Sequence, residues 1–106
     1  MALLLLTVPL GSATQRPAMT YEQLTISSAA VMLDQSKMTG MAGGQGVLQG
    51  AEVRMRCDGT APSTTVGVPI QVGSTINFTN LIDARLCQFL RTTGTDGLLN
   101  VQYFAP

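Results

Sequence analysis

The stretch VRMRCDG, residues 53–59, decides the fold class because its side chains alternate between apolar and charged. On an extended chain, Val53, Met55 and Cys57 point to one side, and Arg54 and Arg56 point to the other. A period of two predicts a strand with one buried face and one solvent-facing face. The Asp-Gly pair at its end is typical of a turn.

Short strands of the same kind are expected on both sides of this stretch. The apolar positions of residues 21–27, 74–79 and 98–104 alternate in the same way, and residues 29–33, 64–68 and 84–91 form further extended runs. We expect residues 84–91 and 98–104 to form a final hairpin, since the linker between them contains two glycines. No strand-helix-strand alternation is visible, so the sequence predicts an all-β fold, a small antiparallel β-sandwich or barrel that is jelly-roll-like.

The chain divides into an N-terminal arm and one domain. A chain of 106 residues has room for a single core. We assign residues 1–18 to an extended apolar arm and residues 19–106 to the sandwich, with a flexible loop at 34–46 that is rich in Gly, Ser and Gln. The apolar side chains of the arm are Leu3, Leu4, Leu5, Leu6, Val8 and Leu10.

The arm has two interpretations. It is short and apolar like a signal peptide, but no Lys or Arg precedes Arg16, and Pro9 interrupts the apolar run. We expect an uncleaved extended segment, which either adds to a sheet edge of another chain or packs on its own domain. No run approaches the roughly 18 apolar residues of a membrane span, so no membrane insertion is expected.

The surface predicted by composition is neutral rather than charged. Six basic and six acidic residues make 11% of the chain, about half the usual fraction, and the formal net charge is zero. Thirteen Thr and eight Gln supply the polar surface instead. This composition favours a subunit whose surface is covered by neighbours, and it offers no electrostatic attraction to nucleic acid.

The residues for common catalytic chemistry are missing. The chain has no His, which excludes Ser-His and Cys-His nucleophile systems and removes the commonest zinc ligand. The carboxylates are scattered, and the glycine-rich residues 40–46 lack the Lys-Ser/Thr of a phosphate-binding loop. We therefore expect no enzyme, no cofactor and no metal site.

The two cysteines, Cys57 and Cys87, leave a disulfide and a pair of reduced thiols both open. Assembly in a reducing cytoplasm would favour the thiols.

Four arginines are candidates for contacts with other proteins, because Arg makes bidentate contacts that tolerate burial. Arg54 and Arg56 are expected on one strand face, and Arg85 and Arg91 on one face of another. If those strands are neighbours, the four side chains form a single polar patch.

Residues 53–67, VRMRCDGTAPSTTVG, resemble small β-sandwich virion proteins of tailed bacteriophages, in which an arginine-rich strand precedes Asp-Gly-Thr-x-Pro and Val-Gly. The resemblance continues through residues 76–78 and through GTDGLLNVQY at 94–103. It implies a capsid decoration or cement protein, or another small virion component, that is usually present as a homo-oligomer or in many symmetric copies, and it implies no enzyme. The sequence departs from the pattern in its apolar extension and at Cys87, where a larger apolar residue is expected.

Three functions follow as hypotheses. The first is a cement protein located in the virion, assembled in the host cytoplasm, that binds the major capsid protein or other virion proteins through its arm and sandwich surface. The second is a component of the tail or the head-to-tail junction. The third is a secreted or periplasmic binding or adhesin module, which requires a cleaved leader and an oxidised cysteine bridge.

Overall fold

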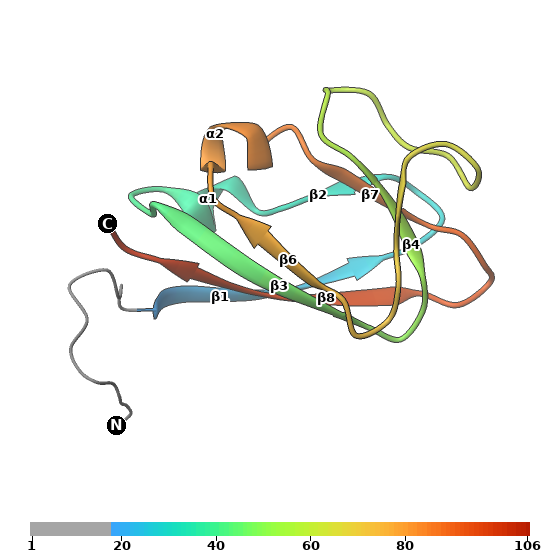
Figure 1. The fold of residues 1–106 in the computed structure, drawn as a ribbon, viewed down its shortest axis with the longest axis horizontal. Coiled ribbons are helices and arrows are strands. Elements are labelled where there is room, and N and C mark those ends of the chain that lie inside the picture. Colours follow the sequence, from blue (N-terminus) through green and yellow to red (C-terminus); the bar gives the residue numbers. More distant parts are fainter. Residues whose placement is uncertain (1–17) are drawn as a thin grey trace.

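The computed structural model describes residues 18–106, which form two four-stranded antiparallel sheets packed face to face (Figure 1). Sheet A contains, in order, β1 (Ala18–Ile26), β8 (Gly97–Phe104), β3 (Gly43–Gln49) and β6 (Thr75–Phe78). Sheet B contains β2 (Val31–Met32), β7 (Gln88–Arg91), β4 (Val53–Arg56) and β5 (Val68–Ile70). Two short helices, α1 (Gln35–Met38) and α2 (Leu81–Ala84), complete the described part. The predicted all-β sandwich is confirmed.

The strand order is that of a jelly roll. The first strand pairs with the last, β2 pairs with β7, β3 with β6 and β4 with β5, and successive pairs fall in alternate sheets. This order arises when a long antiparallel hairpin rolls up into two layers. The jelly-roll-like topology expected from the sequence is therefore present.

The core lies between the sheets and is built by the alternating apolar residues of the strands. Ile26, Phe89, Leu99 and Val101 are fully buried, together with the ring of Tyr103. The Tyr103 hydroxyl donates a hydrogen bond of 2.6 Å to Oε2 of Glu22, and the backbone N–H of Asp34 donates to the same carboxylate. The phenol therefore has an acceptor inside the sandwich.

The structure has a short helix and the start of a strand where a flexible loop was expected, at residues 34–46. Asp34 accepts a hydrogen bond from the backbone N–H of Ser36 and caps α1, and the second half of the range begins β3 in the interior of sheet A. A Cβ at Gly44 would lie 2.9 Å from Cδ1 of Tyr103, and one at Gly46 would lie 3.1 Å from Cδ1 of Leu99. Glycine is used there because the large side chains of β8 fill the space above the strand.

The final hairpin is also corrected. Residues 81–84 form α2, which is capped by the side chain of Asn80, and β7 starts only at Gln88. β7 lies in sheet B between β2 and β4, whereas β8 lies in sheet A between β1 and β3. The linker therefore crosses between the layers. The chain also changes sheet between β3 and β4, at Gly50, whose φ is 91°.

Candidate protein-binding face

The outer side of sheet A carries three rows of side chains that run across its strands. The register places Tyr21, Gln102, Gln45 and Asn77 in one row. The second row contains Gln23, Asn100, Val47 and Thr75, and the third contains Thr25, Leu98 and Gln49. These eleven residues, which we call the neutral face, alternate along each strand with the residues that line the core.

None of the eleven side chains is charged. Eleven of the 89 described residues are charged, so about one charge would be expected at so many positions even in this weakly charged chain. Glu22, the only charged residue of β1, points inward to Tyr103. Outward charges normally keep a solvated sheet face soluble and protect it from association. Their absence here favours a face that is covered by another chain.

Asn100 holds the polar groups of the neutral face in place. Its Oδ1 accepts hydrogen bonds from the Tyr21 hydroxyl at 2.7 Å and from Nε2 of Gln23 at 2.9 Å. Its Nδ2 donates to Oε1 of Gln49 at 2.6 Å. One side chain thus links β1, β8 and β3, and side chains ordered in advance lose less rotamer entropy when a partner binds.

Two apolar groups of the neutral face remain open to solvent. Tyr21 is 50% exposed and Val47 is 42% exposed. Tyrosine is enriched at protein interfaces because its rigid ring buries a large area and its hydroxyl keeps a hydrogen bond. The face therefore offers apolar anchors within a frame of amides and hydroxyls.

The outer side of sheet B differs, because the chain itself covers part of it. Nη1 of Arg54 donates a 2.9 Å hydrogen bond to the carbonyl of Gly67, and Pro62 of the same loop is buried. A Cβ at Gly67 would lie 3.1 Å from Cβ of Pro62, so the loop packs tightly. Among residues 18–106, sheet A is the layer whose outer side lacks such a cover.

The four arginines do not form the single patch proposed from the sequence. β4 and β7 are neighbours, but Arg91 lies opposite the inward-pointing Val53 and forms an ion pair with Asp96. Arg54 and Arg56 are on the outer side of β4, and Arg85 is in the turn after α2. The predicted patch does not form, because the alternation of side chains along β7 places Arg91 on the opposite side of the sheet from Arg54.

Arg56 is engaged within the chain. Its Nη2 lies 2.5 Å from Oδ2 of Asp58, and its Nε donates to Oδ1 at 3.1 Å. The hydrogen bonds from Arg56, followed by one from the backbone N–H of Thr60, hold the pKa of the Asp58 carboxyl below its ordinary value. Asp58 thus acts as a turn residue, as its position before Gly59 predicts.

The other partner-binding residues expected from the sequence lie outside the described residues. Leu3, Leu4, Leu5, Leu6, Val8 and Leu10 all precede residue 18. Their contribution to binding stays a prediction.

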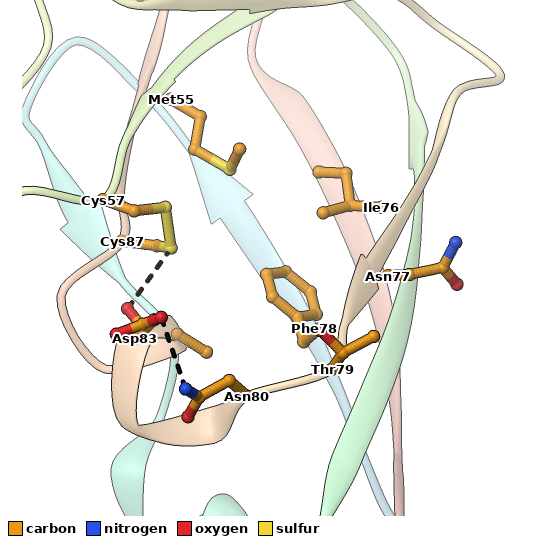
Figure 2. A pocket seen from close by; sticks show the side chains of 10 residues that line it. Met55, Cys57, Ile76, Asn77, Phe78, Thr79, Asn80, Asp83 and Cys87 are labelled. Atoms are coloured by element: carbon orange, nitrogen blue, oxygen red, sulfur yellow. Dashed lines mark hydrogen bonds between the residues drawn. A yellow bond between two sulfur atoms is a disulfide. The ribbon is translucent and has the colours of Figure 1, made fainter.

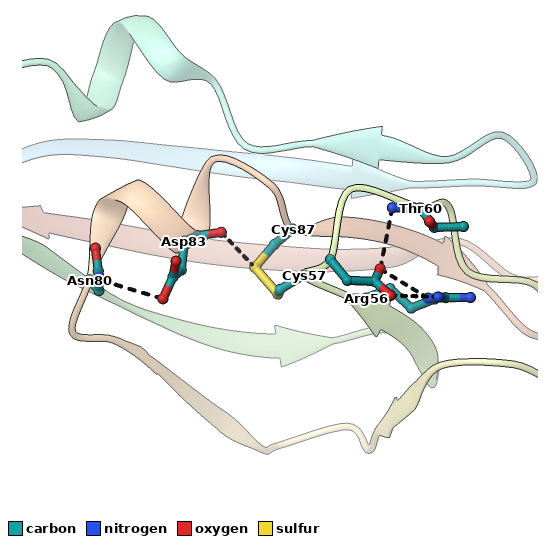
Figure 3. The surroundings of a disulfide bond; sticks show 7 residues. Arg56, Cys57, Thr60, Asn80, Asp83 and Cys87 are labelled. Atoms are coloured by element: carbon teal, nitrogen blue, oxygen red, sulfur yellow. Dashed lines mark hydrogen bonds and ion pairs between the residues drawn. A yellow bond between two sulfur atoms is a disulfide. The ribbon is translucent and has the colours of Figure 1, made fainter.

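Cys57 and Cys87 form a disulfide (Figure 3). Cys57 directly follows β4 and Cys87 directly precedes β7, so the bridge continues the pairing of Arg56 with Gln88 by one position. The sequence left the bridge open, and the preference for reduced thiols in a cytoplasmic setting is not what the structure shows.

A cavity of about 180 Å³ opens beside this bridge. Figure 2 shows the disulfide and Met55 on one side of it, facing Ile76 and Phe78. This volume is below the roughly 300 Å³ at which pockets for drug-sized ligands begin. A larger hollow of about 420 Å³ lies at one end of sheet A, and it is lined by Gln45 and Asn77 of the neutral face together with Phe78 and Phe104. Residues 18–106 contain no group of three His, Cys, Asp or Glu side chains placed to hold a metal ion. The neutral face is therefore the stronger candidate for function.

No protein-family model, curated protein or solved structure matches the chain. Within the described residues, none of the helices has the length and apolar character needed to cross a membrane.

Proposed function

We propose that this chain is a non-enzymatic structural protein of a tailed-phage particle, a capsid decoration or cement protein that binds the major capsid protein or other virion proteins. The jelly roll supports the proposal, because viral capsid domains commonly use it, although lectin domains and cupins use it as well. Since a fold does not define a function, the observation that carries the proposal is the neutral face.

The neutral face favours a permanently assembled protein for a physical reason. An uncharged sheet surface with exposed Tyr21 and Val47 lowers the solubility of a free monomer. In a particle, adjoining subunits cover the same surface, and each Å² of apolar area removed from water contributes about 25 cal/mol before the ordering entropy is subtracted. The few charges and the many Thr and Gln side chains fit the same setting.

In this proposal the N-terminal arm clamps a neighbouring virion subunit. β1 begins at Ala18, so a chain without residues 1–17 keeps the strands β1 to β8 that the structure describes. We expect the truncated protein to fold with unchanged circular dichroism and to lose its binding to particles in co-sedimentation. Full binding by the truncated protein would remove the arm from the mechanism.

Copy number tests the proposal itself. Quantitative mass spectrometry of purified particles of the phage that encodes this chain should find the protein in hundreds of copies per particle. About a dozen copies or fewer would instead place it at the tail or the head-to-tail junction. Absence from the particles would refute a virion role.

The disulfide favours a second candidate, a secreted or periplasmic binding or adhesin module, because structural disulfides persist in oxidising compartments. A virion outside its host also meets oxidising conditions, so the bridge is compatible with both candidates. Mass spectrometry of the native protein, alkylated before and after reduction, separates them. A cleaved N-terminus with a bridged cysteine pair supports export, whereas intact Met1 and thiols that are reduced before host lysis support assembly in the cytoplasm.

A further inference from the structure

We infer that the neutral face binds the neutral face of a second copy of this chain, which gives a two-fold symmetric dimer. The inference rests on the proposed function in one respect, namely that this face is a contact between proteins. It goes further by identifying the partner.

The distribution of charge favours a second copy as the partner of the neutral face. In a two-fold contact the same surface meets itself, so any charge near the axis faces a like charge. The eleven residues of the neutral face include no charge, although eleven of the twelve charged residues of the chain lie among the described residues. Binding to a different protein gains selectivity and speed from complementary charge, which this face does not offer. The neutral face is therefore suited to binding the same face of a second copy.

The hydrogen-bonding capacity of the amide side chains also fits contact with an identical face. Each Asn or Gln side chain both donates and accepts, so an amide can be satisfied by an identical amide from the other copy. The neutral face has six amide side chains, namely Gln23, Gln45, Gln49, Asn77, Asn100 and Gln102. Four of them already make a hydrogen bond within the chain, and the side chains of Gln45 and Asn77 have no such partner among the described residues. A lysine or glutamate in their place could not pair with itself.

The arrangement of the rows allows two copies of the face to interdigitate. Sheets stack at about 10 Å when the side chains of one interdigitate with those of the other. Val47 lies in the middle row between Asn100 and Thr75, and Tyr21 stands at one end of the neighbouring row. These two exposed apolar groups are separated by polar ones, so each copy can place its apolar groups between the amides of the other.

The size of the face sets the expected strength. Eleven residues are about half of the 20 to 30 that each partner contributes to a standard interface. We therefore expect a reversible dimer with a Kd in the micromolar range rather than an obligate one.

The experiment is sedimentation velocity on the full chain at about 5 to about 200 µM, a range that spans a micromolar Kd. The wild-type protein should shift with concentration from the mass of one chain, 11.2 kDa, to twice that mass. Val47→Lys should weaken the dimer at least about tenfold, because it buries a like charge from each copy. Val72→Lys is the matched control, since Val72 is 55% exposed in the turn between β5 and β6, outside the neutral face.

Circular dichroism checks that both variants fold, and Gln45→Lys replaces Val47→Lys if that variant does not. A wild-type protein that stays monomeric throughout overturns the inference and leaves residues 1–17 or another virion protein as the partner of this face. Unchanged dimerisation of the Val47→Lys protein overturns it as well. A monomer that still binds particles leaves the proposed function intact, whereas a dimer that is absent from particles supports the inference and removes the virion role.

Discussion

Breaking the Cys57–Cys87 bridge should lower the free energy of unfolding by about 3.5 kcal/mol. The two cysteines are 30 residues apart, and the loop-closure entropy that a bridge of this span removes from the unfolded chain corresponds to about that value at 25 °C. Reduction of the wild-type protein is the cleanest perturbation, because it breaks the bond without changing a side chain. Cys87 is buried, so its substitution would add a packing loss to the effect.

Urea unfolding with and without a phosphine reductant measures the difference. With a urea dependence of about 1 to 3 kcal/mol per molar, the midpoint should fall by at least about 1 M on reduction. Cys57→Ser is the control, since it lacks the bridge and its midpoint should not respond to the reductant. Equal midpoints for oxidised and reduced wild-type protein would refute the loop-closure argument, and two alkylatable thiols in native protein would refute the bridge.

Two further predictions concern the packing of β8. Gly44→Ala should destabilise the protein by about 1 to 3 kcal/mol, because the new Cβ meets the ring of Tyr103, whereas Gly94→Ala, with no atom within 4 Å, should change stability by less than about 0.5 kcal/mol. Equal urea midpoints for these two variants would contradict the assigned position of β3. Burial, followed by the hydrogen bond and negative charge of Glu22, raises the pKa of the Tyr103 phenol, so its contribution to stability is complete below the unfolded-state pKa of about 10 and is lost as pH rises above it. The stability of the wild-type protein should therefore fall more steeply above about pH 10 than that of Tyr103→Phe, and parallel pH profiles in urea unfolding would contradict this.

The sequence predicted the strands in which apolar side chains alternate with polar ones. Leu99, Val101 and Tyr103 face the core as expected, as do Val53 and Met55. The start of β3 could not be recognised in this way, because its inward positions are glycines and carry no apolar signal. Only the side chains of β8 that pack against Gly44 and Gly46 explain them.

The pairing of the strands could not be predicted from the sequence alone, for a related reason. Alternation tells which side of a strand is buried but not which strand lies next to it, so β7 and β8 looked like a hairpin although they belong to different sheets. The same limit applies to the neutral face. The outward positions of Asn100 and Gln102 were visible in the sequence, but their alignment with Tyr21 and Gln45 depends on the register.

Hydroxyl-radical footprinting tests most directly whether the neutral face is an interface between proteins. Tyr21, at 50% exposure on the neutral face, and Met32, at 41% exposure on sheet B, are both open to water in a single chain. They serve as probe and reference when the free chain is kept at a concentration at which it is monomeric. In particle-bound protein, oxidation of Tyr21 should drop severalfold relative to Met32. Oxidation of Tyr21 at the same relative rate in both states would show that the neutral face stays open to water and would contradict the account.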